Sequence, residues 1–245
     1  LRELANRVHS HGSRIAAQLN HSGKVSQEDV IAGRPVLVPS VPVKGRSDLF
    51  ALLTPEEMAT FIKAAGPDGK GARYHEMTQA DIDTLVQQFA DSARRVQQAG
   101  FDAVEIHAGH GYVISSFLSP AVNRRSDKYG GGIENRARLL CEVITAVREA
   151  TGPGFPIIVR QDAYEFRIEN GIQLDDCVRT ATLAEAAGAD AIDVSAYGDT
   201  SKGIAFTEAP LVHKPGGFID FAKAVKQAVR IPVIAVGRIE LDRAE

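Results

Sequence analysis

The sequence predicts an α/β fold in which short parallel strands alternate with helices. One pattern occurs twice: a helical stretch ends at Ala-Gly and a short apolar strand follows directly, in residues 99–106 and again in residues 187–194. Further apolar strands are separated by amphipathic helical stretches. Apolar strands that alternate with helices are typical of a parallel sheet covered on both faces. The length of 245 residues allows a single α/β barrel.

The composition is that of an ordinary globular protein. Hydrophobic residues make up 44% and charged residues 24%, and 28 basic against 31 acidic side chains give a net charge of −3. No basic block is present, so we expect neither nucleic-acid nor membrane binding. No apolar run approaches the ~18 residues of a membrane span, and the start does not resemble a signal peptide.

The two cysteines, Cys141 and Cys177, lie in helical stretches without Cys-x-x-Cys or Cys/His spacing. Neither a disulfide framework nor a zinc site is therefore expected, and a reducing cytoplasm is the expected location.

The N-terminal part begins inside a helical pattern, residues 1–8, followed by an apolar strand at about 14–19. Residues 24–78 are rich in Gly, Pro and Val and form a long connection, of the kind that usually serves as a lid or an insertion. Within it a short helix is expected to start near Thr54 and Pro55, because threonine caps helices and proline fits the first turn.

The rest of the chain alternates regularly. The first repeat predicts a helix over about 79–99, which ends at Gly100 because glycine takes the left-handed cap conformation, and then a strand that includes Ile106. Apolar positions at helical spacing predict a helix over about 134–150. The remaining expected elements are strands at about 156–160, 189–194 and 232–237 and helices at about 174–187 and 218–229.

Five strands of this kind fit either an open doubly wound sheet or an incomplete (β/α)8 barrel. The glycines at 130–132 lack the spacing of Gly-x-Gly-x-x-Gly, and Gly66 to Lys70 lacks the spacing of a phosphate-binding loop. Neither nucleotide-binding signature is therefore present.

Polar residues stand where the expected strands end. Gln18, Arg160 and Ser195 are the last or nearly last residues of their strands, and Glu105 and His107 share one strand face. Burying such groups without partners costs a few kcal/mol each, so they satisfy one another or bind a polar ligand. In parallel barrels the carboxyl ends of the strands carry the active site, and we favour a ligand there.

The densest polar cluster contains His107, His110 and Tyr112. No third metal ligand is evident nearby, so no metal site is predicted. Two structural histidines are one interpretation. In the other, the imidazoles donate hydrogen bonds to one oxygen and stabilise its negative charge, while the tyrosine donates a proton.

The sequence resembles the Old Yellow Enzyme family of NAD(P)H:flavin oxidoreductases, especially the branch with bacterial 2,4-dienoyl-CoA reductase and trimethylamine dehydrogenase. The resemblance covers nearly the whole chain and is most specific in residues 101–112, which read FDAVEIHAGHGY, and continues through residues 117–136. Residues 18–24, QLNHSGK, and residues 233–239, VIAVGRI, also resemble family motifs.

The resemblance implies an eight-stranded (β/α)8 TIM barrel that binds FMN at its mouth. The expected strands are similar to its third to seventh, with the first, second and eighth missing, so residues 1–245 are interpreted as a single FMN-binding barrel domain truncated at both ends. Longer members carry an iron–sulfur cluster and FAD in a C-terminal region, which here would lie beyond Glu245. The oligomeric state, including a homo-oligomer, is left open.

The resemblance also implies roles for single residues. Gln18 would bind the flavin pyrimidine edge, and Arg160 would stabilise the negative charge of reduced flavin. Gly237 and Arg238 would lie at the flavin phosphate. His107 and His110 would bind the carbonyl oxygen of an unsaturated substrate, and Tyr112 would protonate the neighbouring carbon.

The implied function is transfer of hydride from NAD(P)H, through FMN, to the C=C bond of an α,β-unsaturated carbonyl compound. The alternatives are oxidation of a small amine by a dehydrogenase or demethylase on the same barrel, and a non-catalytic barrel module. Two features depart from the family pattern: residues 161–166, where many relatives have Leu-Ser or similar, and a longer insertion at Leu49 to Arg73.

Structural roles also remain open for several of these residues. Arg160 and Glu105 could form a buried ion pair instead of binding a ligand. Gly237 could be only the turn after a strand, and Arg136 and Arg138 are expected on a solvated or structural helix face.

Overall fold

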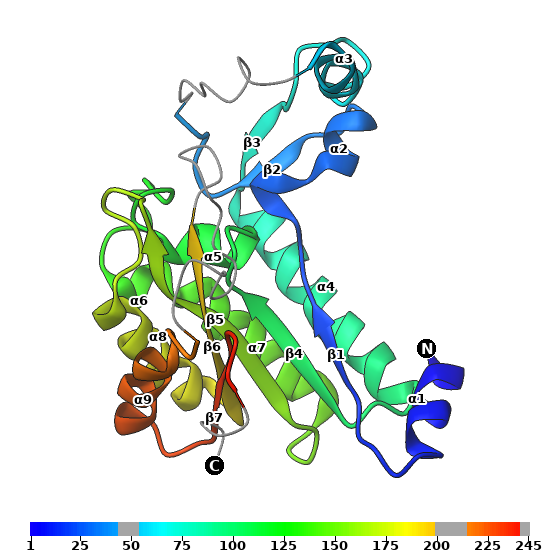
Figure 1. Ribbon diagram of the computed structural model, residues 1–245, viewed down its shortest axis with the longest axis vertical. Helices are drawn as coiled ribbons and strands as arrows, with labels where there is room; N and C mark the ends of the chain where they lie inside the picture. Colours follow the sequence, from blue (N-terminus) through cyan, green and yellow to red (C-terminus); the bar gives the residue numbers. More distant parts are fainter. Residues whose placement is uncertain (44–53, 199–214, 241–245) are drawn as a thin grey trace.

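The main sheet is parallel and has five strands. The computed structural model describes residues 1–43, 54–198 and 215–240. The sheet order is β1-β4-β5-β6-β7, so each strand pairs with the next one of this sheet along the chain (Figure 1). The strands are β1 (Ala16–Leu19), β4 (Ala103–Ala108), β5 (Ile157–Phe166), β6 (Ala191–Gly198) and β7 (Val233–Ala235).

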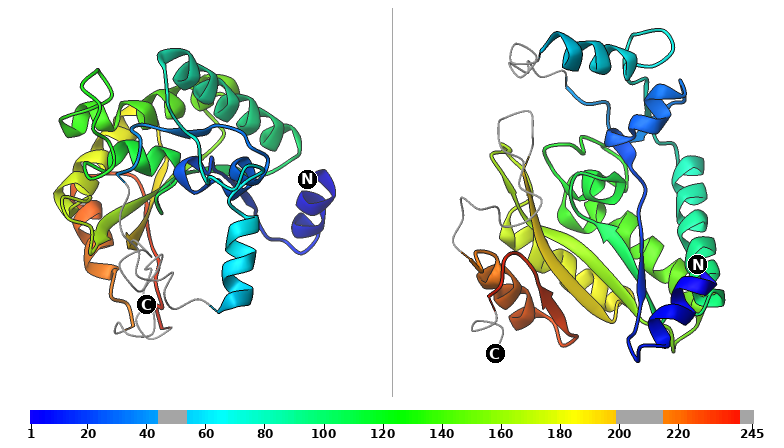
Figure 2. Two further views of the ribbon diagram at one scale, coloured as in Figure 1. Left: turned by 90° about the horizontal axis from the view of Figure 1, so that it is seen from above. Right: turned by 45° about the vertical axis from the view of Figure 1, so that its right-hand side comes forward.

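The helices α4, α7, α8 and α9 contact the strands of this sheet, and Figure 2 shows helices along one of its faces. A doubly wound sheet reverses its strand order at a switch point and carries helices on both faces. The described strands instead run in sequence order, with their helices along a single face. This arrangement favours the barrel type of α/β fold. The helices are α4 (Gln79–Gln98), α7 (Arg138–Thr151), α8 (Leu174–Ala187) and α9 (Ile219–Ala228).

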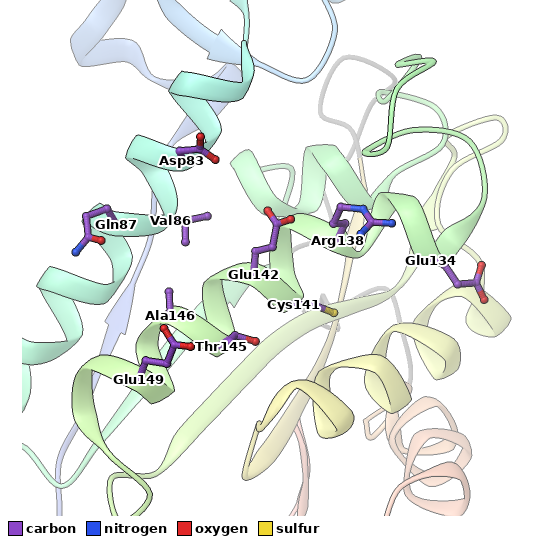
Figure 3. Close-up of a pocket in the computed structure, with 10 residues that line it drawn as sticks. All are labelled: Asp83, Val86, Gln87, Glu134, Arg138, Cys141, Glu142, Thr145, Ala146 and Glu149. Atoms are coloured by element: carbon purple, nitrogen blue, oxygen red, sulfur yellow. The ribbon is translucent and has the colours of Figure 1, made fainter.

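The outer surface of this helical layer is hollowed between α4 and α7. A cavity of about 580 Å³ lies there, lined by Gln87 of α4 and by Cys141, Glu142 and Glu149 of α7, among others (Figure 3). Its walls are helix surfaces, and the carboxyl ends of the strands do not line it.

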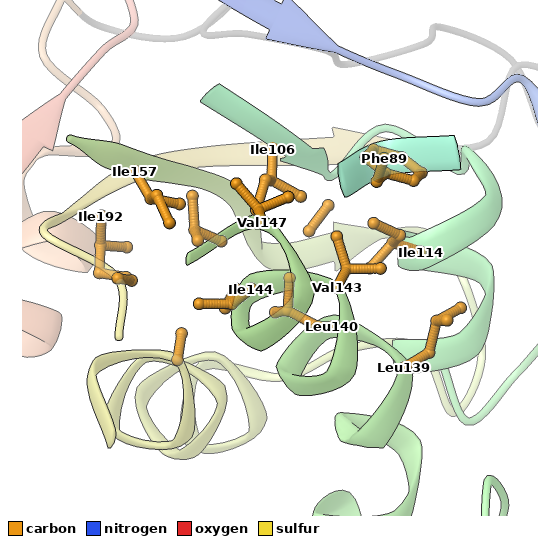
Figure 4. Packing of buried hydrophobic residues seen from close by; sticks show 14 of the residues in the cluster. Phe89, Ile106, Ile114, Leu139, Leu140, Val143, Ile144, Val147, Ile157 and Ile192 are labelled. Carbon is orange, nitrogen blue, oxygen red and sulfur yellow. The ribbon is translucent and has the colours of Figure 1, made fainter. Parts of the chain in front are cut away.

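The core lies between the sheet and the helices. Ile106, Ile157 and Ile192 from three neighbouring strands are fully buried, and Val143 and Val147 of α7 pack among them (Figure 4). Because side chains alternate along a strand, the residues next to these isoleucines in each strand point to the opposite face of the sheet. The helical spacing that predicted α7 therefore identifies its buried side correctly.

Capping residues fix the ends of several helices. The Thr78 hydroxyl accepts a hydrogen bond from the Asp81 N–H, and the Asp81 carboxylate accepts one from the Thr78 N–H. The predicted cap at Thr54 forms the same reciprocal arrangement with Glu57 at the start of α3 (Pro55–Lys63). Gly100 follows α4 with φ of 89°, as the sequence predicts for a glycine after a helix end.

The long connection between β1 and α4 forms a smaller lobe. Its strands β2 (Val36–Val38) and β3 (Tyr74–Glu76) pair in parallel, and Val36 and Val38 are fully buried. Sequence periodicity missed these strands because three residues are too few to show alternation. The lobe also contains η1 (Gly23–Val25) and α2 (Gln27–Ile31), and lies at one end of the molecule with α3 (Figure 1). Residues 44–53, which include part of the Leu49 to Arg73 insertion, lie outside the described residues.

Three predicted boundaries were wrong. The strand expected at about 189–194, with Ser195 at its end, continues to Gly198. The strand expected to end at Arg160 continues to Phe166, with a register shift between Asp162 and Glu165. The helix expected over 134–150 is divided at Ala137 into α6 (Ile133–Arg136) and α7. The remaining helices are α1 (Arg2–His9) and α5 (Val113–Leu118).

Arg136 is structural and not solvated. It is only 7% exposed, its guanidinium donates to the carbonyl oxygens of Leu118 and Gly131, and it forms an ion pair with Asp176. These contacts tie α6 to the chain after α5 and to α8.

Candidate active site

A row of polar side chains crosses the central strands on the face of the sheet opposite the helices. His107 of β4 is the register partner of Arg160 of β5, and Arg160 is the partner of Asp193 of β6. Register partners on neighbouring strands point to the same face. Val159 and Ile192, which adjoin the row in sequence, are buried in the core on the helical side. The row therefore faces away from the helices.

The acidic residue nearest to the Arg160 side chain is Asp193 and not Glu105, with which an ion pair was considered. The Nε atom of Arg160 lies 3.7 Å from Oδ2 of Asp193. Glu105 instead accepts a hydrogen bond of 2.5 Å from Nε2 of Gln18, its register partner on β1. The alternative of an Arg160–Glu105 ion pair is therefore wrong, because on β5 Glu105 faces Ile158, two residues before the arginine.

His107, His110 and Tyr112 form a cluster of rings. The His107 ring centroid lies 4.9 Å from the His110 ring, with 86° between the planes, and 4.9 Å from the Tyr112 ring, with 61° between the planes. His107 is the last residue but one of β4, and Tyr112 is the N-cap residue of α5. The turn between the strand and the helix therefore brings together the three residues that the sequence predicted to act as one group.

His107 is an uncharged imidazole. Burial, followed by the nearby charges of His110 and Arg160, lowers its pKa to about 3. The Gly109 N–H approaches Nδ1 at 3.4 Å, a long contact that makes Nδ1 the acceptor. This contact assigns the proton to Nε2, so the ring presents one N–H donor.

His110 is held by its backbone and by its side chain. Its φ is 59°, a left-handed conformation that is uncommon outside glycine, and its backbone N–H donates to Oδ2 of Asp162 at 2.6 Å. Its Nε2 atom lies 2.8 Å from the hydroxyl of Ser195 in β6. Backbone strain of this kind clusters at functional sites.

The glycines beside His110 are required by close packing. A Cβ atom at Gly109 would lie 2.9 Å from Oδ1 of Asp162. A Cβ atom at Gly111, where φ is 72°, would lie 3.0 Å from the Tyr197 hydroxyl. The Gly-His-Gly turn can therefore lie directly against β5 and β6.

Asp162 was not predicted as a site residue from the sequence. Its side chain is fully buried, and burial, followed by the nearby Glu165 carboxylate, raises its pKa to about 8. Hydrogen bonds from the His110 N–H and the Ser115 hydroxyl act in the opposite direction. The signal in the sequence is its position two residues after Arg160, which places both on one strand face. The predicted strand ended at Arg160, two residues too early to include Asp162.

Gly237 and Arg238 follow β7, which is separated from β5 by β6. Both have positive φ, 104° and 52°, and the Arg238 carbonyl accepts a hydrogen bond of 3.0 Å from the Gly216 N–H. In the sheet, β5 and β6 separate β7 from β4, the strand that carries His107.

Among residues 1–43, 54–198 and 215–240, no group of three or more His, Cys, Asp or Glu side chains could hold a metal ion. Helices long and apolar enough to cross a membrane are likewise absent from these ranges. Cys141 and Cys177 are free thiols in α7 and α8.

Known proteins share both the sequence and the fold. The model of a family described as NADH:flavin oxidoreductase / NADH oxidase matches residues 1–245. An NADPH dehydrogenase of Geobacillus sp. (strain WCH70) is 37% identical over 239 residues, which cover 98% of this chain and 59% of the relative. An NADH oxidase of Thermoanaerobacter brockii is 35% identical over 242 residues, which cover 97% of this chain and 32% of the relative.

A solved structure of 2-naphthoyl-CoA reductase in complex with 2-naphthoyl-CoA is similar with a TM-score of 0.79 and 26% identity, covering 99% of this chain and 35% of that one. The chain therefore spans about a third to three fifths of the length of the proteins it matches.

Proposed function

The chain belongs to the NADH:flavin oxidoreductase / NADH oxidase family, the Old Yellow Enzyme family, and from this premise we propose that it reduces the C=C bond of an α,β-unsaturated carbonyl compound with electrons from NAD(P)H. The observation that carries the proposal is the contact of His107, His110 and Tyr112 beside Arg160. The complex of 2-naphthoyl-CoA reductase with a conjugated acyl thioester supports this substrate class.

We further propose that residues 1–245 are part of a single FMN-binding (β/α)8 barrel domain and carry its third to seventh strands. The sequential order of the five parallel strands supports this assignment, as do the helices along one face. The partial coverage of the relatives fits a chain that holds only some of the barrel strands.

The polar groups on the open face of the sheet fit FMN chemically. The flavin pyrimidine ring carries carbonyl oxygens and ring nitrogens, which suit the amide of Gln18 and the guanidinium of Arg160. Gln18 reaches Glu105 in the structure, so the Gln18 side chain points to the same face as the polar row. The positive φ of Gly237 allows the backbone of residues 237 and 238 to approach a phosphate, and we assign that role to Gly237 and Arg238.

FMN, when bound, would supply the two-electron chemistry that connects NAD(P)H with the substrate. The residues of this chain bind the substrate and move its proton. His107 donates from Nε2 to the carbonyl oxygen, and His110 contributes the second donor, so the negative charge that develops on that oxygen is stabilised. Tyr112 donates its hydroxyl proton to the carbon next to the carbonyl while hydride adds to the carbon beyond it, and the C=C bond becomes a C–C bond.

Replacement of Tyr112 by Phe tests the assignment. We expect Tyr112→Phe to slow alkene reduction on the order of 100-fold or more, the range of general acid catalysis. Reduction of the flavin by NAD(P)H, measured separately by its absorbance, should stay within about twofold. Tyr74→Phe, at an exposed tyrosine of β3, is the control and should change neither half-reaction.

Equal loss of both half-reactions in Tyr112→Phe would reject the role of Tyr112. Turnover of an amine with an artificial electron acceptor, with no reduction of an enone, would instead support the amine dehydrogenase. A colourless protein that binds no flavin would support the non-catalytic module.

A further inference from the structure

Asp162 lies directly behind the turn that carries His110. It is on β5, two residues after Arg160, and its register partner on β6 is Ser195. Its side chain has no exposed surface. A carboxyl group in such a place is unusual, because acidic side chains are rarely fully buried unless they are paired.

The two carboxyl oxygens of Asp162 have different surroundings. Oδ2 accepts hydrogen bonds from the His110 N–H at 2.6 Å and from the Ser115 hydroxyl at 3.3 Å. Oδ1 has no hydrogen-bond partner among the described residues and lies 3.7 Å from Nε2 of His110. A proton on this carboxyl group is therefore best placed on Oδ1, on the side of the imidazole.

The charged and titratable groups around Asp162 favour that protonated form. Glu165 on the same strand and burial both raise the pKa of Asp162, while Arg160 and the two hydrogen bonds to Oδ2 lower it. In α8, burial, followed by the charge of Asp162, raises the pKa of the Cys177 thiol well above its usual range, so the thiol is uncharged. From β6, Asp193 and Tyr197 lie next to Ser195 in the alternating pattern that faces this side. The balance of burial and the Glu165 charge leaves the carboxyl group neutral near pH 7.

The protonation state of Asp162 influences which nitrogen of His110 carries the proton. An O–H group on Oδ1 faces Nε2 of His110, and so does the Ser195 hydroxyl at 2.8 Å. The Ser195 hydroxyl at 2.8 Å, beside a carboxyl group that is neutral and not ionised, favours Nε2 as an acceptor, which places the imidazole proton on Nδ1. An ionised Asp162 would favour a proton on Nε2 instead.

From this geometry we infer that Asp162 is a positioning residue of the active site: it anchors the His110 backbone in its left-handed conformation and, with Ser195, keeps the imidazole proton on Nδ1. The catalytic part of this inference rests on the proposed function, because only a substrate-binding His110 makes its tautomer important for turnover.

The direct test is the tautomer of His110, observed through the nitrogen shifts of its imidazole by NMR in the flavin-loaded protein. At pH 6.5 we expect protonated Nδ1 and unprotonated Nε2, and above about pH 8 a shift of protonation towards Nε2. Asp162→Asn should keep the low-pH pattern at all of these pH values, because its amide imitates the neutral acid. Asp162→Leu should lose the preference for Nδ1. Asp83→Asn, on the outer surface of α4, is the control and should behave like the unchanged protein.

Turnover provides the second readout. In the unchanged protein, kcat for alkene reduction should fall above about pH 8, and in Asp162→Asn this alkaline decrease should be absent. Asp162→Leu should lose on the order of 10- to 100-fold in kcat, the range expected for a misplaced catalytic group. Flavin reduction by NAD(P)H should be little changed.

A proton on Nε2 of His110 at pH 6.5, or a tautomer that is the same in Asp162→Leu, would overturn the inference. So would an alkaline decrease that persists in Asp162→Asn. If Asp162→Leu does not fold, Asp162→Asn and the pH series of the unchanged protein still decide the question. A protein that reduces no enone but shows the expected tautomers would reject the proposed function and leave the role of Asp162 towards His110 intact.

Discussion

His107 and Arg160 face each other as register partners on β4 and β5. The two side chains share the polar face of the sheet, and the cation contributes to the low pKa of the histidine. An imidazole beside a fixed guanidinium stays uncharged over the physiological pH range. His107 can then donate a hydrogen bond to a substrate oxygen without first losing a proton.

The low pKa of His107 predicts an acid-sensitive fold. In the folded chain the pKa is about 3, whereas the ordinary value of 6.5 applies in the unfolded chain. Between these values the unfolded chain binds more protons, so the free energy of unfolding should decrease as the pH falls from about 6.5 towards about 3, by up to ~1.4 kcal/mol per pH unit. Urea unfolding of the unchanged protein and of His107→Gln between pH 7 and pH 4.5 measures the difference.

His107→Gln should show a smaller decrease, because glutamine takes up no proton in either state. His11→Gln, at an exposed position after α1, provides a matched control and should retain the decrease of the unchanged protein. Identical pH slopes in all three proteins would contradict the assignment of a neutral His107.

The raised pKa of Asp162 predicts the opposite dependence of stability on pH. Its pKa of about 8 in the folded chain exceeds the ordinary value of 3.8, so the folded chain holds the extra proton between these limits. The free energy of unfolding should therefore decrease as the pH rises from about 4 to about 8, again by up to ~1.4 kcal/mol per pH unit. Asp162→Asn removes this contribution, and its stability relative to the unchanged protein should increase over that interval. A constant difference between the two proteins would show that Asp162 is ionised in the folded state.

Replacement of Arg160 should change the affinity for FMN and the midpoint potential of the flavin. Arg160→Gln removes the cation that we assign to the flavin edge, so the reduced, negatively charged flavin should lose stabilisation and the midpoint potential should become more negative. We expect FMN affinity to fall on the order of tenfold, the effect of one charge-assisted hydrogen bond. Titration with FMN and spectroscopic redox titration measure both quantities, and Arg94→Gln on the outer helix α4 is the control.

Unchanged affinity and potential in Arg160→Gln would place Arg160 outside the flavin site. In that case its proximity to Asp193, at 3.7 Å, would be its main role.

The fold was largely predictable because its elements are long and periodic. The helix expected over 174–187 has these bounds in the structure, and the buried face of α7 follows the predicted spacing. Local signals such as Gly100 and Thr54 were also sufficient, since each cap involves neighbours in sequence. The two short strands of the smaller lobe were missed because their burial depends on residues about 40 positions apart.

The sequence predicted only those site residues that lie within or directly after the expected strands. Alternation placed Glu105 and His107 on one strand face, Arg160 was expected at the end of its strand, and the structure pairs His107 with Arg160. Asp162 was missed because a polar run after Arg160 resembles the end of a strand. Its burial depends on α5, α8 and the turn at His110, which sequence spacing does not bring together.

The contact between Gly109 and Asp162 predicts an energetic coupling. A Cβ atom at Gly109 would lie 2.9 Å from Oδ1 of Asp162, a distance that forces one of the two residues to move. Gly109→Ala should therefore reduce the free energy of unfolding by about 1–3 kcal/mol, the usual cost of overpacking. In the Asp162→Ala background, where Oδ1 is absent, the same substitution should cost much less, and denaturant unfolding of the four proteins gives the coupling. Gly154→Ala, where a Cβ atom meets nothing within 4 Å, should cost little in either background. Equal costs of Gly109→Ala in both backgrounds would mean that the carboxyl group does not define the space available to the turn.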